Sequence, residues 1–145
     1  MYEPIRTGPS HRPAPRTMAG AADFPHRSRE EELDIQLAGH LAALLAVTEA
    51  LRAVAPSADL DTAAERLAGQ VARLRGRTAP ACTPVAEPRE PSALHRRAHT
   101  LAGRALVVAA SRADTAAAIL TAQRMDAHAA AAAPGGPQPL SGATA

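Results

Sequence analysis

Residues 28–56 read SREEELDIQLAGHLAALLAVTEALRAVAP, and this stretch decides the fold class. Ser28 followed by Glu31 has the form of a capping box, which marks the first turn of an α-helix. Apolar residues then recur at the three- and four-residue spacing of one helix face, interrupted once at Thr48, at Leu37, Leu41, Leu44, Leu51 and Ala55. Pro56 ends the pattern. The stretch therefore predicts a helix from about Arg29 to Val54.

The proline positions divide the rest of the chain. The 13 prolines leave three long intervals free, which are residues 26–55, 57–79 and 92–133. A proline inside a helix costs about 3 kcal/mol, so these intervals are where helices can form. The second interval predicts a helix from about Leu60 to Arg77, with Asp59 as its N-cap. Its apolar stripe is Leu60, Ala64, Leu67, Val71 and Leu74.

The third interval predicts one long helix, continuous or kinked, that opens at Ser92 and extends to about Ala133. Its apolar stripe is Leu94, Ala98, Leu101, Ala105, Val108, Thr115, Ile119 and Ala122. Residues 111–114 can also be read as a fresh helix cap, which would divide the interval in two. We favour the undivided helix.

These elements predict an all-α protein built as a three-helix antiparallel bundle. The bundle would occupy residues 28–133, with a proline-rich linker at 80–91 and disordered proline-rich segments at 1–27 and 134–145. Six Val, three Ile and two aromatic residues are too few for a β-sandwich or barrel. The tripeptide Leu-Ala-Gly recurs inside each predicted helix, ending at Gly39, Gly69 and Gly103, which favours close helix contact at these positions.

The composition limits the chemistry and the core. The chain contains 38 Ala, no Lys and one Cys, which excludes a Schiff-base lysine, a P-loop lysine and a disulfide framework. Alanine brings little apolar area, so we expect a thin core that self-association or a protein partner would complete. The longest apolar runs are too short to span a membrane, and the N-terminus lacks the apolar region of a signal peptide, so we expect a cytoplasmic protein.

Charge is unevenly distributed along the chain. Residues 30–69 hold two Arg against eight acidic residues, net −6, whereas residues 70–112 hold eight Arg against two acidic residues, net +6. The acidic first helix can pair with the basic helices inside one bundle. The basic region could instead contact a protein partner or phosphates of a nucleic acid, through Arg73, Arg75, Arg77, Arg96, Arg97 and Arg104.

No catalytic, cofactor or metal site is predicted, and we expect no enzyme and no small-molecule substrate. His95 and His99 have the i, i+4 spacing of two metal ligands, with His40 or His128 as a third, but the adjacent arginines oppose a cation. Cys82 lies in a predicted loop without an evident base. The acidic run Glu30, Glu31 and Glu32 suits the first turn of a helix.

Two segments carry a family resemblance, LDIQLAGHLAALLAVTEAL at 33–51 and ALHRRAHTLAGRALVVAASRADTAAA at 93–118. Together with the proline-rich linker, they resemble the small Ala- and Arg-rich plasmid-spread proteins of Streptomyces conjugative plasmids and related actinomycete elements. The resemblance covers residues 29–128 and assigns no site residue. It implies a non-enzymatic accessory protein that assists plasmid transfer or spread. A small nucleic-acid-binding regulator that uses residues 70–112 is the alternative.

Overall fold

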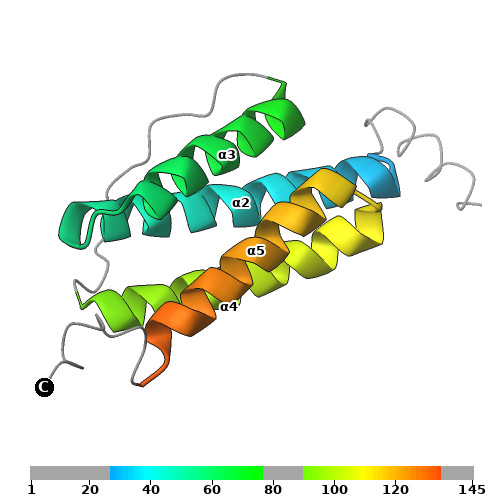
Figure 1. Cartoon of the computed structure of the whole chain (residues 1–145). Helices are drawn as coiled ribbons and strands as arrows, with labels where there is room; N and C mark the ends of the chain where they lie inside the picture. Colours follow the sequence, from blue (N-terminus) through cyan, green and yellow to red (C-terminus); the bar gives the residue numbers. More distant parts are fainter. Residues whose placement is uncertain (1–26, 77–89, 135–145) are drawn as a thin grey trace, which may run out of the picture.

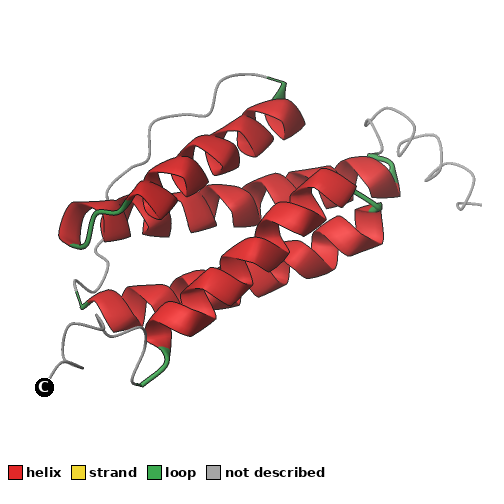
Figure 2. Cartoon of the chain, viewed as in Figure 1, coloured by secondary structure: helices red, strands yellow, loops and turns green. Residues whose placement is uncertain are grey.

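The computed structural model describes residues 27–76 and 90–134, which form four α-helices and no strand (Figures 1 and 2). The predicted all-α class is confirmed. The helices are α2 (Arg29–Val54), α3 (Ala58–Arg75), α4 (Pro91–Arg112) and α5 (Thr115–Ala132). The predictions for Arg77, Cys82, the linker at 80–91 and the two terminal segments fall wholly or almost wholly outside the described residues.

The prediction of three helices is wrong, because the third interval folds as two. Ala113 adopts the left-handed conformation, with φ of 59°, and the Asp114 carboxylate accepts a hydrogen bond of 3.1 Å from the Ala117 N–H. This carboxylate caps α5, so a new helix starts at Thr115 and folds back on α4. The Asp114 side chain satisfies N–H groups in the first turn of a new helix. This capping favours two helices, although the apolar spacing continues across the break.

The four helices form an antiparallel arrangement with one open side. α2 packs against α3 and α4, each of which runs in the opposite direction, and α5 packs antiparallel on α4 (Figure 1). The fourth side, between α3 and α5, is only lightly packed. α3 ends and α4 begins at opposite ends of the bundle. The result is two helical hairpins joined mainly through α2 and α4.

The core combines the leucines of α2 with a mixture of leucine and alanine from its neighbours. Leu37, Leu41, Leu44 and Leu51 are fully buried, which confirms the predicted α2 stripe up to Leu51. On α4 the buried face consists largely of alanine, with Ala98, Ala102, Ala105 and Ala109 fully buried. Eight of the twenty buried apolar residues are Ala. The core therefore holds little apolar area per residue, as the composition predicts.

The predicted stripe fails beyond Val108. Thr115 and Ile119 are exposed, and the buried positions of α5 are Ala117, Leu120, Thr121, Arg124 and His128. Because α5 is a separate helix, its buried positions do not continue the spacing of the buried positions of α4. Thr121 donates to the Ala117 carbonyl at 2.8 Å, and Thr48 on α2 donates to Leu44 at 2.8 Å, so both buried hydroxyls are satisfied.

The predicted cap is confirmed at α2 but not at α3, and α4 begins at Pro91, one residue before the predicted Ser92, with Glu90 as its N-cap. Ser28 and Glu31 form the predicted capping box, with bonds of 3.1 and 3.2 Å. Gly76 ends α3 with φ of 67°, a conformation that favours glycine. The N-cap of α3 is Ser57, not Asp59. Asp59 therefore stands in the first turn of α3, where its side chain is available for another helix.

The predicted close contact at the glycines is wrong. A Cβ atom at Gly39 or Gly69 would meet nothing within 4 Å. At Gly103 it would make only an ordinary contact of 3.5 Å with Met125. The recurring tripeptide is therefore not a packing motif, and the glycines lower helix propensity without a compensating approach of backbones.

α2 differs from the expectation that no segment suits a membrane. Among the described helices, α2 is long and apolar enough to cross a membrane, judged by length and composition alone. In the fold, 44% of its most apolar 18-residue stretch is buried. Its apolar composition has an explanation in the fold, because α2 contacts both α3 and α4. A central core helix must bury two faces, which requires a broader apolar surface than that of an amphipathic helix.

Candidate functional site

A polar cluster lies inside the bundle where α5 approaches the starts of α3 and α4. Its members are Asp59 of α3, His95 of α4, and Arg124 and His128 of α5. Arg124 and His128 are one helical turn apart, so both face inward. We call these four residues the Arg124–His128 cluster. It joins three helices by polar contacts.

Arg124 carries a buried charge. The residue is only 5% exposed, and its Nη1 donates to both carboxylate oxygens of Asp59, at 3.0 and 3.2 Å. Its Nε has no hydrogen-bond partner. The Asp59 side chain is 66% exposed, so the ion pair extends from the interior to the surface. Desolvation of the guanidinium opposes the attraction within such a pair.

His128 is fully buried, and its Nδ1 lies 3.0 Å from Nδ1 of His95. Burial, followed by the nearby charge of Arg124, lowers the pKa of His128 to about 4. Burial and the same guanidinium also lower the pKa of His95. At neutral pH both rings are therefore neutral, and one Nδ1 donates its proton to the other.

The structure pairs His95 with His128, not with His99. Within residues 27–76 and 90–134, no group of three or more His, Cys, Asp or Glu side chains is placed to hold a metal ion. The Arg124 guanidinium lies 3.5 Å from Nε2 of His128 and would repel a cation there. The imidazole pair is better described as a structural contact between α4 and α5.

The structure divides the predicted arginine contacts between two ends of the bundle. Arg73 donates to the Asp114 carboxylate at 2.6 Å, and Arg75 is half-buried at the end of α3. Arg96 and Arg97 lie near the start of α4, at the opposite end, with Arg104 two turns further along. Arg96, Arg97 and Arg104 are all exposed. The described arginines thus do not gather into one basic surface.

Three further ion pairs join different helices, and one of them is of the predicted kind, between an acidic residue of α2 and an arginine of a neighbouring helix. Arg112 of α4 pairs with Asp34 of α2 at 3.0 Å. Arg52 of α2 pairs with Asp61 of α3 at 2.7 Å. The Arg73–Asp114 pair joins α3 to the start of α5. Of these three pairs, the Arg112–Asp34 contact alone matches the predicted direction, because Arg52 places the basic partner on α2 and the Arg73–Asp114 pair does not involve α2.

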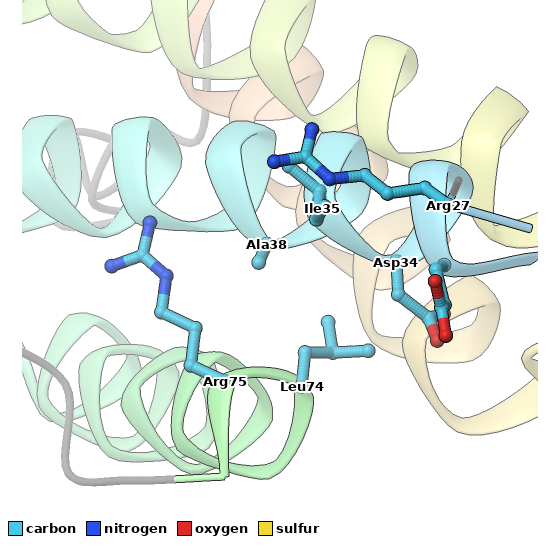
Figure 3. A pocket seen from close by; sticks show the side chains of 7 residues that line it. Arg27, Asp34, Ile35, Ala38, Leu74 and Arg75 are labelled. Carbon is cyan, nitrogen blue, oxygen red and sulfur yellow. The ribbon is translucent and has the colours of Figure 1, made fainter. Parts of the chain in front are cut away.

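A hollow of about 540 Å³ separates the first turns of α2 from the last turns of α3. Figure 3 shows Leu74 and Arg75 of α3 on one side of it, with Ile35 and Ala38 of α2 on the other. Ile35 is 49% exposed here. The hollow follows from the divergence of α3 from α2 toward this end (Figure 1).

The outer surface of α5 carries an exposed isoleucine between two concave regions. Ile119 is 54% exposed. One hollow, of about 300 Å³, is lined mainly by alanines at 109, 110, 113, 118 and 122. The other, of about 430 Å³, lies between α3 and α5 and is lined by Arg66, Gly69, Gln70, Ala116, Ile119, Leu120 and Gln123. We call Ile119 and these two hollows the α5 edge.

The α5 edge is largely uncharged. No ionisable side chain occurs from Thr115 to Gln123. At its margins lie Asp114, which is paired with Arg73, and Arg66 of α3. Sequence reasoning places Ile119 in the core, and its exposure becomes apparent only once the break at Ala113 is known. The edge is therefore an apolar surface that the apolar spacing of the sequence does not predict.

Comparison with known proteins gives no relative from which a function could be transferred. No protein-family model matches the chain, and neither the curated proteins nor the solved structures contain a significant match.

Proposed function

We propose that this chain is a non-enzymatic helical interaction protein that binds a protein partner through the α5 edge. The observation that carries the proposal is Ile119, more than half exposed between two hollows on an uncharged stretch of helix. Contiguous exposed apolar surface with concave relief is typical of interaction sites. Partner side chains that enter the hollows would bury Ile119 and the apolar surface around it.

The thin core supports the same proposal. Eight of its twenty buried apolar residues are Ala, and the α3–α5 side is only lightly packed. Complete burial of a side chain such as Ile contributes about 1.5–3 kcal/mol. A partner at the α5 edge would therefore add burial on the side where the bundle has least.

Photo-crosslinking in the host cell tests the proposal. Ile119 is replaced by benzoylphenylalanine, and Val107, which is 67% exposed on α4, receives the same replacement as a matched control. We expect a protein adduct from position 119 and none from position 107. If position 119 gives no protein adduct, the α5 edge is not a binding face and the proposal fails.

We further propose that the biological setting is conjugative plasmid transfer or spread in an actinomycete. This step rests on the resemblance of residues 29–128 to plasmid-spread proteins. Deletion of the gene from its host element should reduce spread through recipient mycelium. Transfer and spread at the parental level would contradict this role and leave the interaction proposal to the crosslinking experiment.

Nucleic-acid binding is the second candidate, supported by Arg96, Arg97 and Arg104, which are exposed along one helix. Binding through phosphate contacts should weaken steeply as salt increases. In that case Arg96→Ala combined with Arg97→Ala would reduce the affinity for duplex DNA and make its dependence on salt shallower. Absence of duplex binding at low salt would remove this candidate.

A further inference from the structure

We infer that the partner at the α5 edge is a second copy of this chain, related to the first by a two-fold axis. This inference rests on the proposed binding role of the α5 edge and goes further by identifying its occupant. Three properties of the edge favour a second copy: its charge, its relief and its place in the bundle.

The first property is the absence of charge at the centre of the edge. Two identical charged surfaces repel each other, whereas two identical neutral surfaces do not. From Thr115 to Gln123 the chain has no ionisable side chain, although 30 of its 145 residues are Arg, Asp or Glu. The neighbouring Asp114 is neutralised by Arg73, whose Nη2 lies 2.6 Å from the carboxylate. Arg66 of α3 lines the second hollow at the margin of the edge, whereas the centre of the edge is neutral and electrostatically compatible with its own copy.

The second property is the self-complementary relief of the edge. Ile119 projects beside a hollow whose walls are mainly alanine side chains. A two-fold axis can place Ile119 of each copy in the hollow of the other, so that every projection and every hollow is used. Small side chains such as Ala110 and Ala118 also allow two helices to approach toward the short end of the usual 8–10 Å axial separation.

The third property is the position of α5 in the fold. α5 packs closely on α4 but only lightly on α3. In the described part of the chain no helix covers the outer side of Ile119, which is 54% exposed. Pairing of α5 with α5 would give this helix a second extensive neighbour. It would also close one edge of a bundle that is open on that side.

Sedimentation equilibrium of the full chain, from low micromolar to near-millimolar concentration, tests the inference. We expect a reversible monomer–dimer equilibrium. Ile119→Asp removes the projection and Ala110→Arg fills the hollow, and each should raise the dimer dissociation constant at least about tenfold. Val107→Asp, at an exposed position that lines neither hollow, is the matched control and should leave the constant unchanged.

Circular dichroism first establishes that all variants retain the helical signal, as substitutions at exposed positions should. A wild-type chain that stays monomeric at every concentration overturns the second-copy inference. So does a dimer whose dissociation constant is unaffected by both Ile119→Asp and Ala110→Arg. A monomer that still gives a crosslink from position 119 to a different protein would sink this inference while the proposed function survives.

Discussion

The Nδ1 atoms of His95 and His128 lie 3.0 Å apart across the α4–α5 interface, with the Arg124 guanidinium 3.5 Å from the far nitrogen of His128. This contact requires a neutral acceptor ring opposite a donor ring. If both rings were protonated, two donors would face each other beside a buried cation. The interface between the last two helices is therefore built for neutral imidazoles.

Acidification should destabilise the bundle through His128. Burial lowers the pKa of His128 to about 4 in the folded chain, against about 6.5 when unfolded. Below pH 6.5 the unfolded chain binds the proton more readily, so stability is full above pH 6.5 and decreases toward pH 4. The loss should reach about 3 kcal/mol. Urea unfolding followed by circular dichroism over this pH range measures it.

His128→Gln provides the control for this pH dependence. The variant removes the titrating ring, so its stability should vary much less between pH 6.5 and pH 4, whatever its absolute value. If the variant retains the wild-type slope over that interval, another group is responsible.

The two partners of the Arg124–Asp59 pair should respond differently to substitution. Asp59→Ala leaves the buried guanidinium without its carboxylate and should destabilise the fold by about 1–3 kcal/mol. Arg124→Met removes the buried charge and its unpartnered Nε, and it leaves an exposed carboxylate, so it should be neutral or stabilising. Chemical denaturation measures both. Equal destabilisation by the two substitutions would contradict this account.

Asp114 should prove to be the residue that divides the third interval into two helices. Asp114→Ala removes the α5 cap and the contact with Arg73, and it should cost about 1–2 kcal/mol. Asp114→Asn retains a good capping side chain while it removes the charge, so it should cost less. Thermal unfolding of the two variants separates the capping contribution from the ion pair. A loss for Asp114→Asn as large as the loss for Asp114→Ala would assign the effect to the charge instead.

Alanine should be more stable than glycine at helical position 39, and glycine more stable than alanine at the two left-handed positions, 76 and 113. Gly39→Ala adds a methyl group in open space and should stabilise α2 by about 0.5–1 kcal/mol. Gly76→Ala forces alanine into a left-handed conformation, with φ of 67°, and should destabilise the fold. Ala113→Gly, at φ of 59°, should relieve the same strain and stabilise it. Melting temperatures measured for all three decide the matter.

The α2 helix could be predicted almost completely from sequence, because its signals are local. Ser28, Glu31 and the leucine spacing lie within one segment, and each acts on neighbours along the chain. The break at Ala113 corresponds to the alternative in which residues 111–114 form a fresh helix cap. Continuity of apolar spacing favoured the wrong reading, since small residues fit either side of an alanine-rich helix equally well.

The candidate sites depend on long-range geometry that no local pattern contains. Asp59 and Arg124 are 65 residues apart, and His95 and His128 are 33 residues apart. Their contacts exist only because α5 reverses direction at Ala113. The same reversal turns Ile119 outward. Neither the polar cluster nor the α5 edge can therefore be predicted while residues 92–133 are taken as one undivided helix.

The alanine-rich core has an evolutionary consequence. At Ala98, Ala102, Ala105 and Ala109, all fully buried, a single nucleotide change in an alanine codon yields only larger, polar, glycine or proline residues. Larger residues overpack such positions, whereas glycine and proline weaken the helix. Accepted change on this face of α4 should therefore occur as coordinated pairs, in which a facing leucine of α2 becomes smaller as an alanine becomes larger. Such covariation between α2 and α4 is the pattern that homologous sequences should display.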